Sequence, residues 1–451
     1  MNELEKLAEF IVNFKLDNAP SEAVDAAKIC ILDSFGAAVG ACKDELIESI
    51  VEEYKLYYPN ENQVNIWGKN IKMPLFQGIF LNALMGHRLE LDDVHTKSKT
   101  HIGTVVVPTG ICLAQALYLS GSELLEAVIC GYETMSRIGM GFGVSSHRKK
   151  GWHVTSTAGT FGAAAVASKL LKLDVEKTVY ALGMAGTQSF GLWAFLEDSA
   201  SSKILHPARA AQSGAEAAVL ARSGMTGPRS ILTAKDGSLF RAMSDEYDLS
   251  LVSKDLGSVY EILNVDNKPY PCCRSTHCVI DSAIKLREEY DIDVNAIDEI
   301  IVETYQVGYM QCGVTEGSKN PKTATEAKFS APYTFAVAFL KGNVTLEDFK
   351  LENIAGAKVR ELLRKVTVLP NEEFTNRYPE HWGCKSTLRL FDGTEYTAEV
   401  ADALGSVYNP MSKKAVKNKV IPLLKVGYDD AENMTEKILN IEECPDLTFI
   451  W

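Results

Sequence analysis

The sequence lacks three signatures that identify common enzyme classes. It contains no G-x-x-x-x-G-K-[ST] phosphate loop and no G-x-S-x-G nucleophile turn. The run Gly139-Met-Gly-Phe-Gly143 has no third glycine at the dinucleotide-binding spacing and no strand before it, so we interpret it as a helix end. We therefore expect neither a nucleotide cofactor nor serine hydrolysis.

Basic residues are in the minority. Lys and Arg together number 46 against 59 Asp and Glu, which gives a formal net charge of −13. This balance argues against nucleic acid or an anionic membrane as the main partner. If the substrate is an anion, the positive charge that binds it must be local.

The cysteines follow no ligand or disulfide pattern. Ten are scattered through the chain, and Cys272, Cys273 and Cys278 have neither zinc nor iron–sulfur spacing. No signal pattern is visible at the N-terminus. We expect reduced thiols and a cytoplasmic protein.

Length and periodicity predict the fold. A chain of 451 residues with 46% hydrophobic content can build two domains. Helical spacing dominates residues 1–267, strand-like runs and a hairpin turning at Asp392-Gly393 appear within 268–403, and helical spacing returns over 404–451. We predict a mainly α protein with a large all-α domain built from both ends of the chain and an inserted α+β lid domain.

Apolar and small residues mark the centre of the helical domain. Residues 102–122 carry no charge, but they include a proline and several polar residues, so we interpret them as a buried helix rather than a membrane span. Residues 158–167 and 208–217 are rich in Ala and Gly, which lets helices approach closely. His153 and Lys203 precede these two helices, near N-termini that favour anions.

Residues 87–103 contain three carboxylates and three histidines. They could form a solvated loop, a metal site or a catalytic cluster. The candidates for metal ligands are His87, Asp92, Asp93, His95 and His101, and His87 and His95 would share a face if a helix continued. Because no pair has the tight spacing of H-E-x-x-H, we expect no metal, and we expect the carboxylates to orient the histidines.

Four further positions each allow two interpretations. His153 could be a core or a catalytic histidine, and Lys203 a helix-end cation or a substrate ligand. The stretch from Lys268 to His277 gathers cations, prolines and a histidine at the predicted domain boundary, which is more than a passive linker needs. Tyr333 is a core or a site tyrosine.

Together these motifs resemble the 2-methylcitrate dehydratase (MmgE/PrpD) family. The series runs in order along nearly the whole chain: H-x-x-E-x-D-D, H-x-G, G-W-H, K before R-A-A-x-x-G, T-G-P, K-P-Y-P-x-C-R-x-x-H and A-K-F-S-x-P-Y. The resemblance implies the helical domain and inserted lid, a homodimer, and neither metal nor organic cofactor.

The resemblance also implies a site. Matched motif by motif, the catalytic residues would be His101, His153, Lys203 and His277. The residues that bind substrate would be Asp93, Lys268, Arg274 and Tyr333. We assign proton transfer to His101 and His153, charge stabilisation to Lys203 with Arg274 or Lys268, and closure over the substrate to His277.

Members of the family act on small di- and tricarboxylates by dehydration, decarboxylation or epimerisation. We expect a lyase resembling 2-methylcitrate dehydratase, with an iminodisuccinate-type epimerase or a cis-aconitate decarboxylase as alternatives. Glu90 and Val94 replace the outer residues of an Asp-x-Asp-Asp-Thr pattern, and the loop before His101 is one residue longer. These departures leave room for an epimerase or another substrate. A metal-dependent hydrolase and an inactive binding protein are the hypotheses from other classes.

Overall fold

The computed structural model describes residues 1–58, 63–198 and 200–450. Within them the chain forms two compact units. The helical unit comprises Met1–Leu196, Ser202–Asn267 and Ser412–Trp451, and the second unit comprises Glu197–Ser201 and Lys268–Met411. The prediction that the chain is mainly α is confirmed. The predicted domain boundaries at 268 and 403 stay a prediction.

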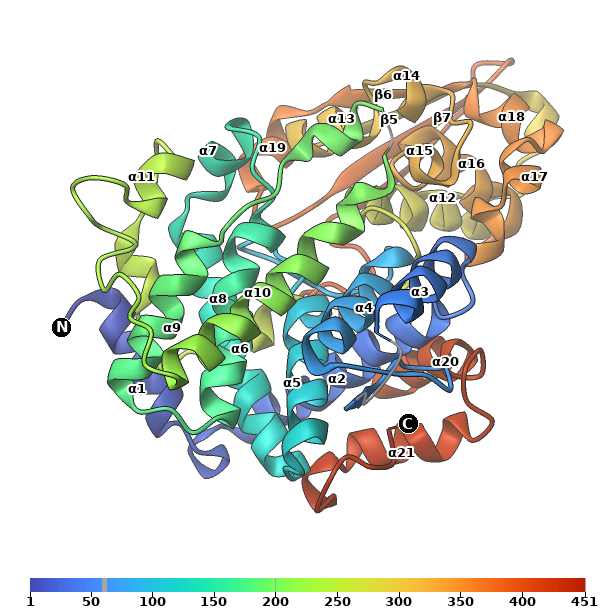
Figure 1. Ribbon diagram of the computed structural model, residues 1–451. Coiled ribbons are helices and arrows are strands. Elements are labelled where there is room, and N and C mark those ends of the chain that lie inside the picture. Colours follow the sequence, from blue (N-terminus) through green and yellow to red (C-terminus); the bar gives the residue numbers. More distant parts are fainter. Residues whose placement is uncertain (59–62, 199, 451) are drawn as a thin grey trace. The chain divides into compact units, whose positions relative to one another are not determined.

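The helical unit contains helices from both ends of the chain (Figure 1). Its principal elements are α1 (Glu3–Asn13), α2 (Ser21–Gly40), α3 (Glu45–Tyr57), α4 (Leu75–Arg88), α5 (Gly103–Leu117), α6 (Gly121–Gly141), α7 (Val144–Lys149), α8 (Val154–Leu170), α9 (Val175–Thr187), α10 (Leu205–Arg222), α11 (Leu239–Met243), α20 (Lys413–Leu424) and α21 (Ala431–Leu439). Two short antiparallel sheets accompany them, pairing β1 (Val64–Asn65) with β2 (Lys72–Met73) and β3 (Val94–His95) with β4 (Val265–Asp266). The unit is therefore not purely helical.

Helices α5, α6, α8 and α10 form the centre of this unit and pack side by side (Figure 1). Their small residues allow the close approach that the sequence predicts. A Cβ atom at Gly214 of α10 would lie 2.3 Å from the carbonyl oxygen of Thr160 in α8, so only glycine fits there. This contact brings the N-terminal ends of the two helices together, and His153 and Lys203 with them.

Helix α5 is the buried helix predicted from the uncharged run 102–122. Every residue from Gly103 to Ala114 is buried, and Pro108 lies inside the helix. Among the described residues, we find no helix with the length and hydropathy needed to cross a membrane.

The second unit packs helices against a mixed four-stranded sheet. The strand order is β6 (Val366–Pro370), β5 (Ile297–Thr304), β7 (Cys384–Leu390) and β8 (Glu395–Val400), and only the β5–β6 pair is parallel. Its helices are α12 (His277–Glu289), α13 (Gln306–Cys312), α14 (Glu316–Lys319), α15 (Ala324–Lys328), α16 (Ala331–Lys341), α17 (Leu351–Ile354), α18 (Ala357–Leu363) and α19 (Glu372–Arg377). The predicted hairpin is confirmed as β7–β8, with Gly393 at φ +86°.

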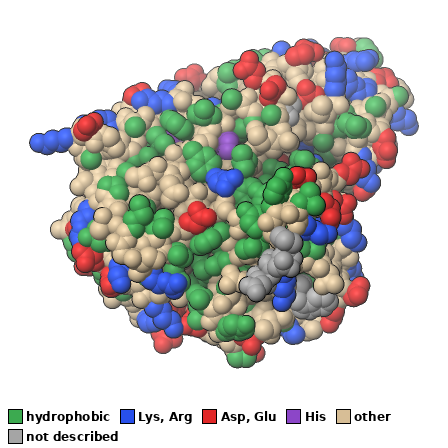
Figure 2. All heavy atoms as spheres, in the orientation of Figure 1, with side chains coloured by type: hydrophobic (Ala, Val, Ile, Leu, Met, Phe, Trp, Pro, Cys, Tyr) green, Lys and Arg blue, Asp and Glu red, His purple; other side chains and the backbone are tan. Residues whose placement is uncertain are grey.

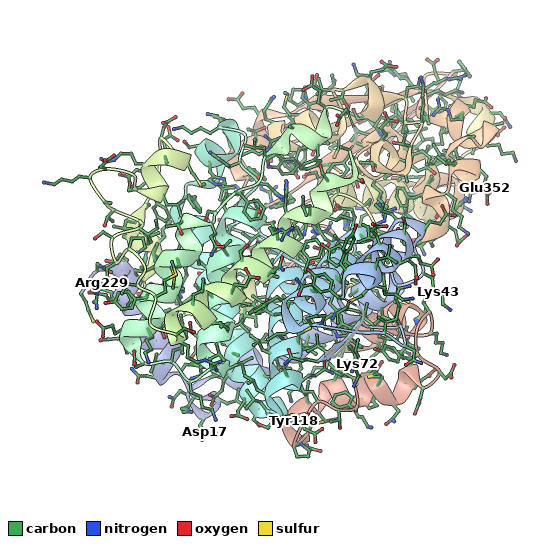
Figure 3. The ribbon with its side chains drawn as sticks, in the orientation of Figure 1. Asp17, Lys43, Lys72, Tyr118, Arg229 and Glu352 are labelled. Carbon is green, nitrogen blue, oxygen red and sulfur yellow. The ribbon has the colours of Figure 1, made fainter. Side chains whose placement is uncertain are left out.

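Charge of both signs lies on the outside of the protein. On the face drawn in Figure 2, acidic and basic side chains are interspersed. Figure 3 labels Asp17, Lys72 and Arg229 on the helical unit, and all three are exposed. The cation most relevant to an anionic ligand is instead buried, because Lys203 is only 6% exposed.

Candidate active site

The segment after α4 carries the first part of the candidate site. Helix α4 ends at Arg88, and Glu90 adopts a left-handed backbone with φ +59°. The chain then turns through buried residues to β3, which pairs with β4. The solvated-loop interpretation is wrong, because Asp92, Asp93 and most of their neighbours are buried.

The side chain of Asp92 orients two histidines. Its Oδ2 atom lies 2.6 Å from Nδ1 of His87 and 3.1 Å from Nδ1 of His101. The Nδ1 atom of His101 also lies 2.9 Å from the carbonyl oxygen of Asp93. Both neighbours of this nitrogen are acceptors, so Nδ1 of His101 donates a hydrogen and the lone pair of the neutral ring lies on Nε2.

Asp93 supports the turn into α5. Its Oδ2 atom accepts a 2.5 Å hydrogen bond from the Tyr132 hydroxyl, and its Oδ1 atom accepts a 2.9 Å bond from the Gly103 N–H. Burial raises the pKa of Asp93 to about 7, although the bonds from Tyr132 and Gly103 lower it. These contacts hold His101 at the start of α5; a direct contact of Asp93 with substrate stays a prediction.

His153 is the N-cap residue of α8 and is buried. Its ring centre lies 5.0 Å from that of Trp193, in an edge-on arrangement. Its Nδ1 atom lies 2.9 Å from Nδ1 of His206, in the first turn of α10. Burial, followed by the charges of His206 and Lys203, holds the pKa of His153 well below its ordinary value, so the ring is neutral at pH 7.

Lys203 pairs with Glu90. The ammonium group donates a hydrogen bond to Oε1 of Glu90, and both side chains are almost fully buried. Lys203 lies in the 3₁₀ turn Ser201–Ile204 directly before α10. Lys203 is therefore a buried cation at a helix end, and its contact with a substrate stays a prediction.

A lysine from the C-terminal helix α20 supports the same loop. The ammonium group of Lys419 donates to Oδ1 of Asp33 at 2.6 Å and to the carbonyl oxygen of Leu91 at 2.8 Å. Burial raises the pKa of Asp33, and Lys419 opposes that shift. The end of the chain thus holds the backbone between Glu90 and Asp92.

Three of the predicted residues meet in this unit. The ring centre of His87 lies 4.8 Å from that of His101 and 6.3 Å from that of His153. The charges of Lys203 and His101 both act on His153. The structure therefore brings His101, His153 and Lys203 together around His87.

Apart from Asp93, the remaining four predicted residues belong to the second unit. His277 begins α12, with Nε2 3.4 Å from the carbonyl oxygen of Cys272 and its ring 5.2 Å from that of Tyr270. Lys268 and Arg274 are buried in the same segment. The Tyr333 hydroxyl donates to the carbonyl oxygen of Asp348, and this contact favours the core interpretation. The roles of all four stay predictions.

Only part of the predicted ligand set could hold a metal. Ligand atoms of His87, Asp92 and His101 lie within 4.8 Å of one another. Two ligands on a tetrahedral zinc ion with bonds of about 2.0–2.1 Å lie about 3.3 Å apart. The separations of 2.6 and 3.1 Å are those of hydrogen bonds, so a metal would have to break contacts that already satisfy these groups.

His95 does not share a helix face with His87, because the helix does not continue to it. The helix ends at Arg88, before the second turn that would align the two rings. His95 lies in β3, with Nδ1 2.7 Å from the Ser98 hydroxyl and Nε2 3.1 Å from Oε2 of Glu261. These contacts tie the loop to Glu261.

Sequence reasoning missed His206 and Lys419. His206 follows Lys203 by three residues at the start of α10, so the i, i+3 spacing of two polar residues before an Ala-rich helix was the available signal. Lys419 lies in an ordinary amphipathic helix with several other lysines, and nothing in the local pattern distinguishes it.

Comparison with known proteins finds two family domains and several relatives. Residues 5–252 match the MmgE/PrpD N-terminal domain, and residues 270–444 match the MmgE/PrpD C-terminal domain. The chain is 26% identical to cis-aconitate decarboxylase of Mus musculus, over 98% of this chain and 92% of the relative. It is 27% identical to the Homo sapiens protein of that name, over 99% and 93%. It is 22% identical to a probable 2-methylcitrate dehydratase of Saccharomyces cerevisiae, over 93% and 83%.

The two domain matches together span most of the chain in the order that the motifs predict. The relatives match over nearly their full length as well. The resemblance read from the motifs is confirmed: the chain belongs to the MmgE/PrpD family.

Proposed function

We propose that this protein is a cofactor-independent lyase that removes a proton from the carbon next to a carboxylate in a small di- or tricarboxylic acid. The observation that carries the proposal is the meeting of His101, His153 and Lys203 in one buried cluster of the helical unit. Relatives named decarboxylase and dehydratase support a lyase.

The chemistry requires a base and a stabilised negative charge. A hydrogen on carbon beside a carboxylate is a very weak acid, so the charge that develops on the carboxylate oxygens must be stabilised as the proton leaves. Lys203 and the N-terminal ends of α8 and α10 lie together and would supply that stabilisation. A neutral histidine supplies the base and a protonated histidine supplies the acid, contributing on the order of 10²–10⁴-fold.

The two histidines suit different roles. His101 carries its hydrogen on Nδ1, bonded to acceptors, so its Nε2 atom can take or return a proton. His153 is neutral and lies beside Lys203. Dehydration of an acid like 2-methylcitrate is the first candidate reaction: one neutral histidine takes the proton, and the other, protonated beforehand, gives its proton to the departing hydroxyl. Decarboxylation of an acid like cis-aconitate and epimerisation of the iminodisuccinate type are the alternatives.

The proposal is tested by incubating the protein with a panel of di- and tricarboxylates in D₂O and following exchange and products by NMR. We expect at least one acid to exchange its α-hydrogen or form product. The Lys203→Ala and His153→Gln variants should each slow the exchange or the product formation at least about 100-fold. A Lys425→Ala control, which removes an exposed ion pair with Glu432, should behave as wild type. Wild-type rates in both site variants would exclude the assignment.

We also propose that the protein is a cytoplasmic homodimer that binds its polycarboxylate without nucleic acid or membrane. The family resemblance supports the dimer, and the absence of disulfide spacing among the cysteines supports the compartment. Analytical ultracentrifugation of the full chain tests the dimer, because a species of 49.5 kDa alone would contradict it.

A further inference from the structure

The contact between His153 and His206 joins two nitrogens of the same kind. Nδ1 of His153 lies 2.9 Å from Nδ1 of His206, and the two ring centres are 5.1 Å apart. A neutral imidazole carries one hydrogen, and two bare lone pairs or two N–H groups at this distance would repel. One ring must therefore donate from Nδ1 and the other must accept at Nδ1.

Both rings are neutral at pH 7. Burial, followed by the charges of His87 and Lys203, lowers the pKa of His206 to about 4. The pKa of His153 is lowered more strongly, by burial and by the charges of His206, Lys203, His87 and His101. Lys203 itself is paired with the carboxylate of Glu90. Because both rings are neutral, His153 and His206 share one hydrogen between their two Nδ1 atoms.

Proton abstraction selects one of the two arrangements. When His153 takes a proton on Nε2 it becomes an imidazolium with hydrogens on both nitrogens, so its Nδ1 must donate. Only His206 with a lone pair on Nδ1 can accept that bond. In the arrangement in which His206 donates, the hydrogen of His153 lies on Nε2, so this nitrogen has no lone pair with which to take the substrate proton.

We infer that His206 is a positioning residue that accepts a hydrogen bond from Nδ1 of His153 and so makes Nε2 of His153 the nitrogen that receives the substrate proton. His206 stabilises the imidazolium as it forms, in a place where burial and Lys203 oppose positive charge. It does not take the proton itself, because its own ring stays neutral. The inference rests on the proposed role of His153 in proton transfer.

The tautomer can be measured without any substrate. In protein labelled with ¹⁵N-histidine, the two ring nitrogens of His153 are identified by the signals that His153→Gln removes. At neutral pH we expect the hydrogen on Nδ1 in wild type and in His206→Asn, whose Oδ1 atom can accept in place of Nδ1. In His206→Leu the hydrogen should move, at least in part, to Nε2. A wild-type His153 with its hydrogen on Nε2 would overturn the inference, even if the Leu variant does not fold.

Kinetics provide the second readout. We expect His206→Leu to lower kcat about 10-fold or more, with KM changed less than about twofold. Because the imidazolium of His153 loses its acceptor, the acidic limb of the pH profile of kcat/KM should also shift to lower pH. His206→Asn should restore most of both. His381→Leu, at a histidine paired with Asp402 in the second unit, is the control for histidine loss.

The outcomes separate this inference from the proposed function. If wild type neither exchanges nor converts any acid, the proposed function fails, while the tautomer measurement still decides the role of His206. If His153→Gln abolishes exchange but His206→Leu leaves kcat, the pH profile and the tautomer unchanged, only the role of His206 is wrong.

Discussion

The ammonium group of Lys203 and the carboxylate of Glu90 form an ion pair in which each side chain is only 8% exposed. The cation proposed to bind a substrate carboxylate is therefore already paired with a carboxylate of the protein. Glu90 is held there by a left-handed backbone that residues other than glycine rarely adopt. An anionic substrate must share Lys203 with Glu90 or replace it.

Replacing Glu90 by Gln should have opposite effects on binding and stability. We expect a dicarboxylate identified in the exchange panel to bind more tightly to Glu90→Gln, because Lys203 no longer has an anionic partner. The unfolding free energy should fall by about 3 kcal/mol, since a buried charge loses its counter-charge. Calorimetric titration measures the first effect, and urea unfolding the second. Glu432→Gln at an exposed pair should change neither by more than about 1 kcal/mol. Weaker binding by Glu90→Gln would contradict this view of the pair.

Lys419 should matter for both stability and activity. Lys419→Met leaves Asp33 buried without its cation and removes a donor from the Leu91 carbonyl. We expect a loss of about 3–5 kcal/mol in unfolding free energy, together with lower kcat, because the loop that carries Asp92 loosens. Adding Asp33→Asn should recover part of the stability, since the uncompensated carboxylate is gone. Lys425→Met, at an exposed site on the same chain segment, should cost less than about 1 kcal/mol.

Asp93 should make the protein less stable as the pH rises. Its pKa is about 7 in the folded protein against an ordinary value of 3.8, so the folded state binds more protons between about pH 4 and pH 7. The unfolding free energy of wild type, minus that of Asp93→Asn, should fall by up to about 1.4 kcal/mol per pH unit across this range. Urea unfolding at several pH values measures the difference. A difference that stays level or rises would show that the carboxyl is not held protonated.

His147 should have the opposite pH effect. It is buried, with Nε2 3.1 Å from the Thr157 hydroxyl, and burial lowers its pKa to about 3 from an ordinary 6.5. The unfolded state therefore binds more protons between these values, and the folded protein loses stability as the pH falls through them. Relative to that of His147→Asn, the unfolding free energy of wild type should fall by up to about 1.4 kcal/mol for each pH unit below about pH 6.5. Equal slopes for the two proteins would contradict the buried neutral ring.

Chelation should not affect the activity. The ligand atoms of His87, Asp92 and His101 are already joined by hydrogen bonds. Dialysis against EDTA should therefore leave the exchange rate unchanged, and metal analysis of the purified protein should find less than one ion per chain. Stoichiometric zinc, iron or manganese that restores activity to dialysed protein would favour the metal-dependent hydrolase instead.

Local pattern was sufficient for most of the fold, whereas the expected site residues came from the family resemblance. The Ala- and Gly-rich runs around 158–167 and 208–217 became the close-packed α8 and α10, and Asp392-Gly393 became the hairpin turn. These features depend on neighbouring residues: small side chains permit close helices, and glycine permits a left-handed turn. The helix ends at Arg88, so the condition under which His87 and His95 would share a face is not met.

What the sequence by itself determined was which ionisable residues stand beside the ends of buried helices, and the family they match. Only the tertiary structure decided their partners. His153 meets His206 from 53 positions away, Lys203 meets Glu90 from 113, and Lys419 meets Asp33 from 386. A buried charge or ring must find a partner wherever packing places one, and spacing along the chain carries no information about contacts between helices that lie so far apart in sequence.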